Sequence, residues 1–93
     1  MKIRTETEGV LETVRLERMR QDQKWDGAKH DDKHTVFDFI RWIKNYAGWA
    51  SQMADMNSFP RTRKRLIQIA ALAVAAVESM DRKAVEKITK DMD

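Results

Sequence analysis

The chain has 93 residues, of which 42% are hydrophobic and 35% are charged, and its formal net charge at pH 7 is +3. This length predicts one small domain, and the mixture of residues excludes an intrinsically disordered chain. The absence of cysteine excludes disulfide frameworks and thiolate metal sites, while the mild positive charge permits an anionic ligand without indicating a nucleic-acid-binding protein.

Two stretches bear on membranes and export. The longest uninterrupted apolar run, residues 69–77, is shorter than the roughly 20 residues that a helix needs to span a bilayer. The N-terminal stretch MKIRTETEG lacks the apolar core of a signal peptide. We therefore expect a cytoplasmic protein without a membrane partner, in keeping with the absence of cysteine.

A first helix is expected from Thr7, which can act as its N-cap, to about Gln23. Its apolar stripe is incomplete, which predicts a position on the surface of the core. Residues 25–34 are expected to form a loop, because Asp26 and Gly27 are a turn signal.

A second helix is expected to begin at a capping box formed by Thr35 and Asp38 and to end near Asp55. Two neighbouring apolar stripes follow the helical alternation of three and four residues. They consist of Val36, Ile40, Ile43, Ala47, Ala50 and Ala54, and of Phe39, Trp42, Tyr46, Trp49 and Met53. At this spacing the aromatic residues are more often part of a core or a subunit interface than a surface that stacks on a base.

A third helix is expected over residues 61–80, after a break in which Ser58 can cap and Pro60 can occupy the first turn. Residues 66–77 are apolar nearly all round, which predicts burial on several sides. A short final helix is expected around residues 84–88.

These elements predict a single all-α domain over residues 1–93, a bundle of three long helices plus a short C-terminal helix. The apolar surfaces of the second and third helices exceed what one small domain needs to bury. We therefore expect a homo-oligomer, a dimer or higher, to complete the bundle.

The order of the segments resembles a known family. It reads Glu-Arg-x-Arg-Gln-Asp-x-Lys-Trp, a His/Asp-rich connection, Tyr-x-Gly-x-Ala, and Leu-Ile-Gln-x-Ala-Ala-x-Ala-Val-Ala-Ala. Over about residues 15–83 the chain is similar to small phage and prophage proteins of the MazG-like all-α nucleoside triphosphate pyrophosphohydrolase group. The resemblance implies a helical oligomer in the cytoplasm of a bacterial host, with carboxylates holding Mg²⁺ on a triphosphate.

The chain departs from this family where the family carries its carboxylates. Aligned on Gly48, those positions hold Asn45, Tyr46, Trp49, Arg65 and Gln68. Mg²⁺ needs hard oxygen ligands, usually including carboxylates. The resemblance therefore implies a non-catalytic relative with no cofactor, no metal and no catalytic residues, which binds a nucleotide or other phosphate ligand and could sequester a host signal.

Seven residues are predicted to bind that ligand, between the 25–34 segment and the start of the third helix. Cations at a helix start oppose the helix dipole unless an anion also lies there, and Trp25 can stack on a base. The histidines can donate hydrogen bonds. The predicted residues are Lys24, Trp25, His30, His34, Arg61, Lys64 and Arg65.

Three alternatives remain open. Residues 30–34 could bind Zn²⁺ or Mn²⁺, although five consecutive residues cannot all converge on one ion. A metal-dependent pyrophosphohydrolase could use non-standard carboxylates, namely Asp22, Asp31, Asp32 or Asp38. The basic residues 61–65 could instead form a module that binds nucleic acid or a host protein, or they could pair with acidic groups of the chain itself.

Overall fold

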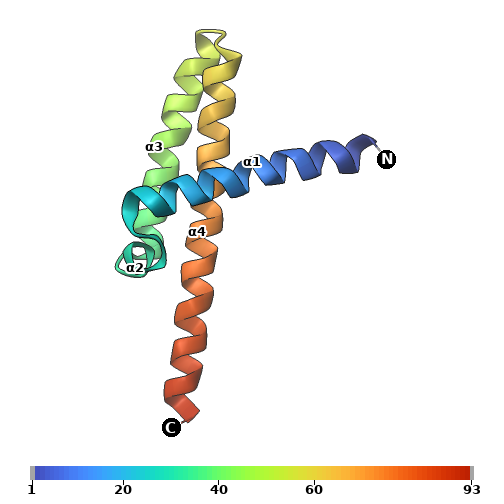
Figure 1. The fold of residues 1–93 in the computed structure, drawn as a ribbon. Coiled ribbons are helices and arrows are strands. Elements are labelled where there is room, and N and C mark those ends of the chain that lie inside the picture. The colour runs from blue at the N-terminus through green and yellow to red at the C-terminus, as the bar shows by residue number, and fades with distance from the viewer. Residues whose placement is uncertain (1, 93) are drawn as a thin grey trace.

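The computed structural model describes the backbone of residues 2–92 and the side chains of residues 5–92. Within these residues the elements are α1 (Lys2–Trp25), α2 (Gly27–Asp32), α3 (Val36–Asp55) and α4 (Phe59–Met92), with no strand (Figure 1). The predicted all-α fold is therefore confirmed.

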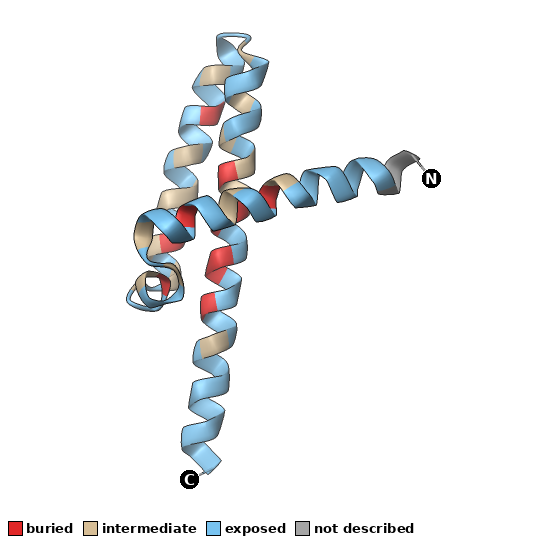
Figure 2. Cartoon of the chain, viewed as in Figure 1, coloured by how far each residue is buried: buried red, intermediate tan, exposed pale blue. Residues whose placement is uncertain are grey.

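Helices α3 and α4 run side by side as an antiparallel hairpin, and α1 lies across α4 (Figure 1). The short helix α2 packs against both α1 and α4. The N-terminal part of α1 and the C-terminal part of α4 extend away from this crossing (Figure 1). The buried residues therefore concentrate where the helices cross, as Figure 2 shows.

The core is small and centres on Phe39, whose side chain is 2% exposed. Ala75 and Ala76 of α4 pack against this ring, and Trp42 covers it from the same helix. Alanine side chains are short, so they let α3 approach α4 closely at this level. The alanine-rich stretch of α4 thus has a packing role on the side that faces α3.

The predicted capping box starts α3. The Thr35 hydroxyl accepts a hydrogen bond from the Asp38 backbone N–H at 3.3 Å, and the Thr35 backbone N–H donates to the Asp38 carboxylate at 3.1 Å. That N–H, together with His34 and Arg41, holds the pKa of Asp38 below its ordinary value. The start and the end of α3 agree with the sequence prediction.

The segment predicted as a loop contains α2 instead. Asp26 and Gly27 have left-handed φ angles of 70° and 56°, which turn the chain sharply after α1. The segment is then attached to α4, because the Lys83 ammonium donates to the His34 carbonyl at 2.7 Å and Ser79 and Arg82 bind α2. The loop prediction was wrong because these tertiary contacts were not visible in the local pattern.

Two helix limits also differ from the prediction. Helix α1 begins at Lys2 rather than Thr7, and it continues through Gly9. Helix α4 continues to Met92, so no separate helix forms at residues 84–88. No glycine or proline follows Pro60, so nothing in the chain breaks α4.

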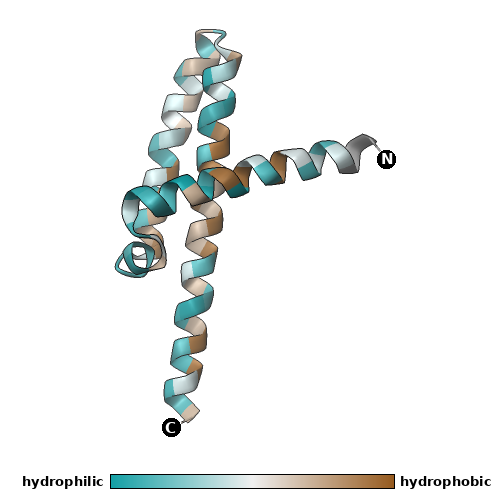
Figure 3. Ribbon diagram, in the orientation of Figure 1, coloured by the Kyte–Doolittle hydropathy of each residue, from teal (hydrophilic) through white to brown (hydrophobic). Residues whose placement is uncertain are grey.

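Helix α4 is buried where it meets α1, α2 and α3, but part of its surface stays uncovered within the single chain. Large apolar side chains remain exposed along it, and Figure 3 shows brown segments continuing down the unpaired part of the helix. These side chains are Phe59, Leu66, Val74, Val77, Met80, Val85, Ile88 and Met92. In the part of the chain that the structure covers, no helix is long and apolar enough to cross a membrane.

Candidate functional site

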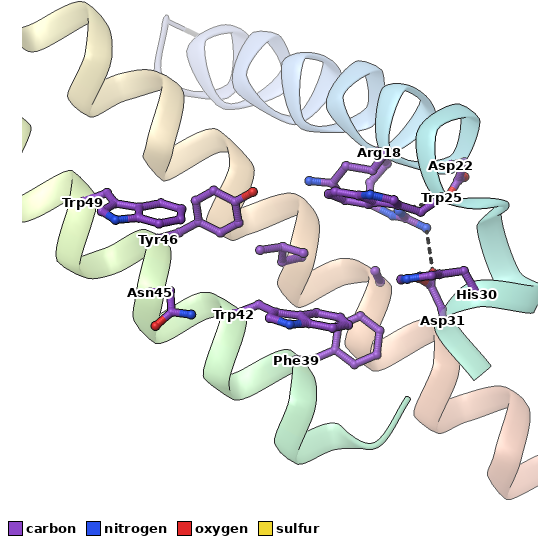
Figure 4. Close-up of a pocket in the computed structure, with 13 residues that line it drawn as sticks. Arg18, Asp22, Trp25, His30, Asp31, Phe39, Trp42, Asn45, Tyr46 and Trp49 are labelled. Atoms are coloured by element: carbon purple, nitrogen blue, oxygen red, sulfur yellow. Dashed lines mark hydrogen bonds and ion pairs between the residues drawn. The ribbon is translucent and has the colours of Figure 1, made fainter. Parts of the chain in front are cut away.

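A pocket of about 300 Å³ lies between α1 and α3. Both helices pack on α4, yet no Cα atoms of α1 and α3 lie within 8 Å of one another. Leu72 and Ala75 of α4 line the pocket, as do residues from α1, α2 and α3 (Figure 4). The space therefore exists because α1 crosses α4 without closing onto α3.

Aromatic rings make up much of the lining. The predicted aromatic stripe of α3 faces the pocket, with Phe39 and Trp42 edge to face at 5.1 Å and Tyr46 and Trp49 edge to face at 5.0 Å between ring centroids. Trp25, the last residue of α1, supplies a ring from another helix (Figure 4). The stripe interpreted from sequence as core or interface is thus mostly a pocket wall.

His30 lies in the layer between two of these rings. Its centroid is 6.0 Å from that of Trp25 and 6.1 Å from that of Trp42, with interplanar angles of 22° in both cases. Figure 4 shows Trp25 on the α1 side of the pocket and Trp42 on the α3 side, with His30 toward α2. A flat ring in the layer of the imidazole would therefore meet an indole on either side.

Arg18 is surrounded by carboxylates at the same end of the pocket. Its side chain is 14% exposed and forms ion pairs with Asp22 at 3.0 Å, Glu78 at 3.3 Å and Asp31 at 3.6 Å. These three anions compensate its single positive charge. Arg18 therefore orders this end of the pocket without making it basic.

Asp31 is the buried acid of the site, with a side chain that is 9% exposed. A hydrogen bond of 3.3 Å joins its Oδ1 to His30 Nδ1. Its Oδ2 accepts no hydrogen bond, and the contact from Arg18 at 3.6 Å is too long to be one. The pocket therefore contains a buried carboxylate oxygen with unused hydrogen-bonding capacity.

Arg65 lies at the other end of the aromatic wall. Its guanidinium carbon is 5.5 Å from the Tyr46 ring centroid and 5.0 Å from that of Trp49, so it covers both rings. Its Nη1 donates to the Gln68 side-chain oxygen at 3.1 Å. No carboxylate of residues 5–92 pairs with Arg65, so its charge is uncompensated there.

Four of the predicted ligand-binding residues lie at the α2 end. Trp25 and His30 line the pocket, and the Lys24 ammonium is 5.0 Å from the Trp25 ring centroid. The His34 ring contacts His30 at 4.7 Å and Trp42 at 4.8 Å, so it supports the pocket from behind without lining it.

The start of α4 is not brought to these four residues. Ser79 contacts α2, and the length of α4 from Arg61 to Ser79 is about 27 Å at a helical rise of about 1.5 Å per residue. Lys64 lines a second pocket of about 350 Å³ between α1 and α4, where Arg20 pairs with Glu17 at 2.7 Å and holds the pKa of Glu17 low. Arg65 alone of the basic cluster borders the aromatic wall.

Residues 5–92 contain no group of three or more His, Asp or Glu side chains placed to hold a metal ion. The four aspartates considered for metal-dependent catalysis each contact a cation: Arg18 for Asp22 and Asp31, Arg82 for Asp32, and Arg41 for Asp38. Each of the four aspartates therefore has an ion-pair partner within the chain.

Arg18 and the floor of α4 were not predicted as parts of a binding site, and Asp31 was considered only for metal binding and metal-dependent catalysis. Nothing local marks Arg18 as a pocket residue, and nothing local distinguishes buried Asp31 from exposed Asp32. The sequence feature that could have indicated the pocket was the width of the aromatic stripe on α3.

No protein-family model, curated protein or solved structure matches this chain. A function can therefore be inferred only from the chemistry of the pocket.

Proposed function

We propose that the chain is a non-catalytic binding protein for a nucleotide, whose base enters the aromatic pocket and whose phosphate contacts Arg65. The observation that supports this most is that the pocket has aromatic rings on two sides and a guanidinium without a carboxylate partner at its edge. Trp25 and Trp42 flank the layer of His30, while Arg65 borders the pocket wall at Trp49.

The size and lining of the pocket suit a single base. A volume of about 300 Å³ lies at the small end of ligand pockets in proteins. Stacking of a base on an aromatic side chain contributes about 1–3 kcal/mol. A base held between two indoles would therefore gain most of its affinity from stacking, with polar contacts adding orientation.

The phosphate is assigned to Arg65 rather than to Arg18. Three carboxylates already surround Arg18, so a phosphate beside it would meet more negative than positive charge. Arg65 is half-buried and has only the Gln68 amide as a hydrogen-bond partner in the described chain. Its fork of N–H groups suits a phosphate.

The relation to the MazG-like group remains part of this proposal, as does a phage or prophage setting with sequestration of a host signalling nucleotide. The relation to this group is supported by the location of the residues that stand where the family carries its carboxylates. Asn45, Tyr46 and Trp49 line the pocket, and Arg65 covers the last two rings while donating to Gln68. Without carboxylates at this end, direct contacts from Arg65 would replace a metal ion.

Isothermal titration calorimetry with nucleosides and nucleoside monophosphates tests the proposal. Arg65→Gln should reduce monophosphate affinity toward that of the nucleoside and leave nucleoside affinity unchanged. Arg61→Gln is the matched control, because Arg61 is exposed on the same helix and lines neither pocket. The proposal fails if millimolar nucleotides give no binding heat, or if both variants bind monophosphates like the wild type.

We also propose that the protein forms a homo-oligomer in the cytoplasm of a bacterial host. The support is the set of exposed apolar side chains on α4, including Val74 and Val77, which are 42% and 55% exposed. A second copy of the chain would bury these side chains.

A further inference from the structure

Asp31 has one carboxylate oxygen that the fold leaves without a hydrogen bond. Among the buried side-chain oxygen and nitrogen atoms of residues 5–92, only Asp31 Oδ2 has no hydrogen-bond partner. The residue lines the pocket, and Figure 4 shows it beside His30 at the end of the pocket nearest α2. The unsatisfied oxygen therefore belongs to the space that a ligand would enter.

A buried carboxylate oxygen without a hydrogen bond is unfavourable for the free protein. His30 occupies Oδ1, and Arg18 is shared with Asp22 and Glu78. A donor supplied from within the pocket would relieve this cost. The ligand edge that meets Asp31 should consequently carry N–H groups and no acceptor.

We propose that Asp31 makes the pocket selective for guanine, by accepting hydrogen bonds from the N1–H and 2-amino groups of the base. This inference rests on the proposed nucleotide-binding function. Guanine presents two adjacent donors on one edge, and a charged acceptor makes such bonds short and strong. Adenine and cytosine place an acceptor nitrogen beside their amino group, and uracil flanks its single N–H with two carbonyl oxygens.

The arrangement of the neighbouring rings fits this orientation. His30 precedes Asp31 in the chain and lies nearly parallel to both Trp25 and Trp42. A base stacked in that layer would present its edge toward α2, where the Asp31 carboxylate lies. The lining is also acidic at this end, because Asp22 and Asp31 outnumber the single cation Arg18.

Tryptophan fluorescence titrations of the full chain with GMP, IMP, 1-methyl-GMP and AMP test the inference. IMP lacks the 2-amino group and 1-methyl-GMP lacks N1–H, so each should bind about 10- to 100-fold more weakly than GMP. AMP should be weaker than GMP by at least the same factor. These comparisons change only the ligand, so they do not depend on the folding of a variant.

Asp31→Asn then assigns the preference to this residue. The ratio of GMP to AMP affinity should fall toward one, while AMP affinity changes by less than about threefold. Glu78→Gln is the matched control, because Glu78 also pairs with Arg18 but does not line the pocket, and its replacement leaves the buried Oδ2 of Asp31 in place. The ratio of GMP to AMP affinity of this control variant should equal that of the wild type.

The outcomes separate the two proposals. Binding of all four nucleotides with equal affinity overturns guanine selectivity and leaves nucleotide binding standing. A GMP preference that persists in Asp31→Asn overturns the role of Asp31. Absence of binding by every nucleotide overturns both proposals together.

Discussion

Arg82 of α4 binds Asp32 of α2 through two guanidinium nitrogens, with Nε 3.1 Å from Oδ2 and Nη2 2.9 Å from Oδ1. The Ser79 hydroxyl donates to the same carboxylate at 2.8 Å. These contacts attach α2 to α4 and so position His30 and Asp31 at the pocket.

Arg82→Ala is expected to loosen α2 without unfolding the bundle. Backbone amides of residues 30–34 should exchange hydrogen faster, while those of α3 retain their protection. Lys90→Ala, which removes an exposed pair with Glu86, is the control and should change neither set. Unchanged exchange in residues 30–34 of Arg82→Ala would contradict the attachment.

Stability should fall in acid because of Asp32 and Asp38. Arg82 and Ser79 hold the pKa of Asp32 below 3.8, and the Thr35 backbone N–H, His34 and Arg41 do the same for Asp38. Since both folded-state pKa values are lowered, their stabilisation is present above pH 3.8 and is lost as the pH falls through the folded-state values.

Urea unfolding measured across the acid range checks this dependence. The variant Asp32→Asn/Asp38→Asn should show a smaller loss of unfolding free energy below pH 3.8 than the wild type. Identical slopes for the two proteins would mean that other acids dominate.

The capping box makes Thr35→Ala destabilising. Loss of an N-cap hydroxyl typically costs about 1 kcal/mol. Thr89→Ala is the control, because its hydroxyl donates only to the Val85 carbonyl on the exposed end of α4. Chemical denaturation of both variants measures the difference, and equal stabilities would argue against the cap.

The small core makes Phe39→Ala severely destabilising. Phe39 is 2% exposed, so its removal should cost about 3–5 kcal/mol of unfolding free energy. Phe37→Ala removes the same side chain at a position that is 76% exposed and should stay within about 0.5 kcal/mol of the wild type. Thermal or urea unfolding compares the two, and a loss below 1 kcal/mol for Phe39→Ala would place the core elsewhere.

The exposed apolar face of α4 predicts self-association. Sedimentation at micromolar concentration should give at least twice the chain mass of 10.9 kDa, and Val77→Glu should shift the protein toward the monomer. Val77 is 55% exposed in the single chain, so a charge there should leave the folded monomer intact. A wild type that sediments only as a 10.9 kDa species would contradict the oligomer.

The limits of α3 could be predicted because their causes are local. A capping box needs only Thr35 and Asp38, and the alternation of three and four residues up to Asp55 is a property of one helix. The all-α class follows from the same kind of periodicity. The sequence therefore determined which segments are long helices, with errors at the ends of α1 and α4.

Helix α2 could not be predicted in this way. Its attachment depends on Ser79 and Arg82, which are far away in the chain. The same attachment, with Arg18, makes Asp31 buried and Asp32 exposed, although both are aspartates in one short segment. Local sequence carries no information about that difference.

The binding site shows the same division. Trp25 and His30 were predicted to bind a ligand, but Lys64 and Arg65 were predicted to act together and instead border different pockets. Successive helical residues are rotated by about 100°, so neighbours on α4 necessarily face different partners. Tertiary packing alone decided that one face of α4 meets α1 and another meets α3, and that the gap between those two helices became an aromatic pocket.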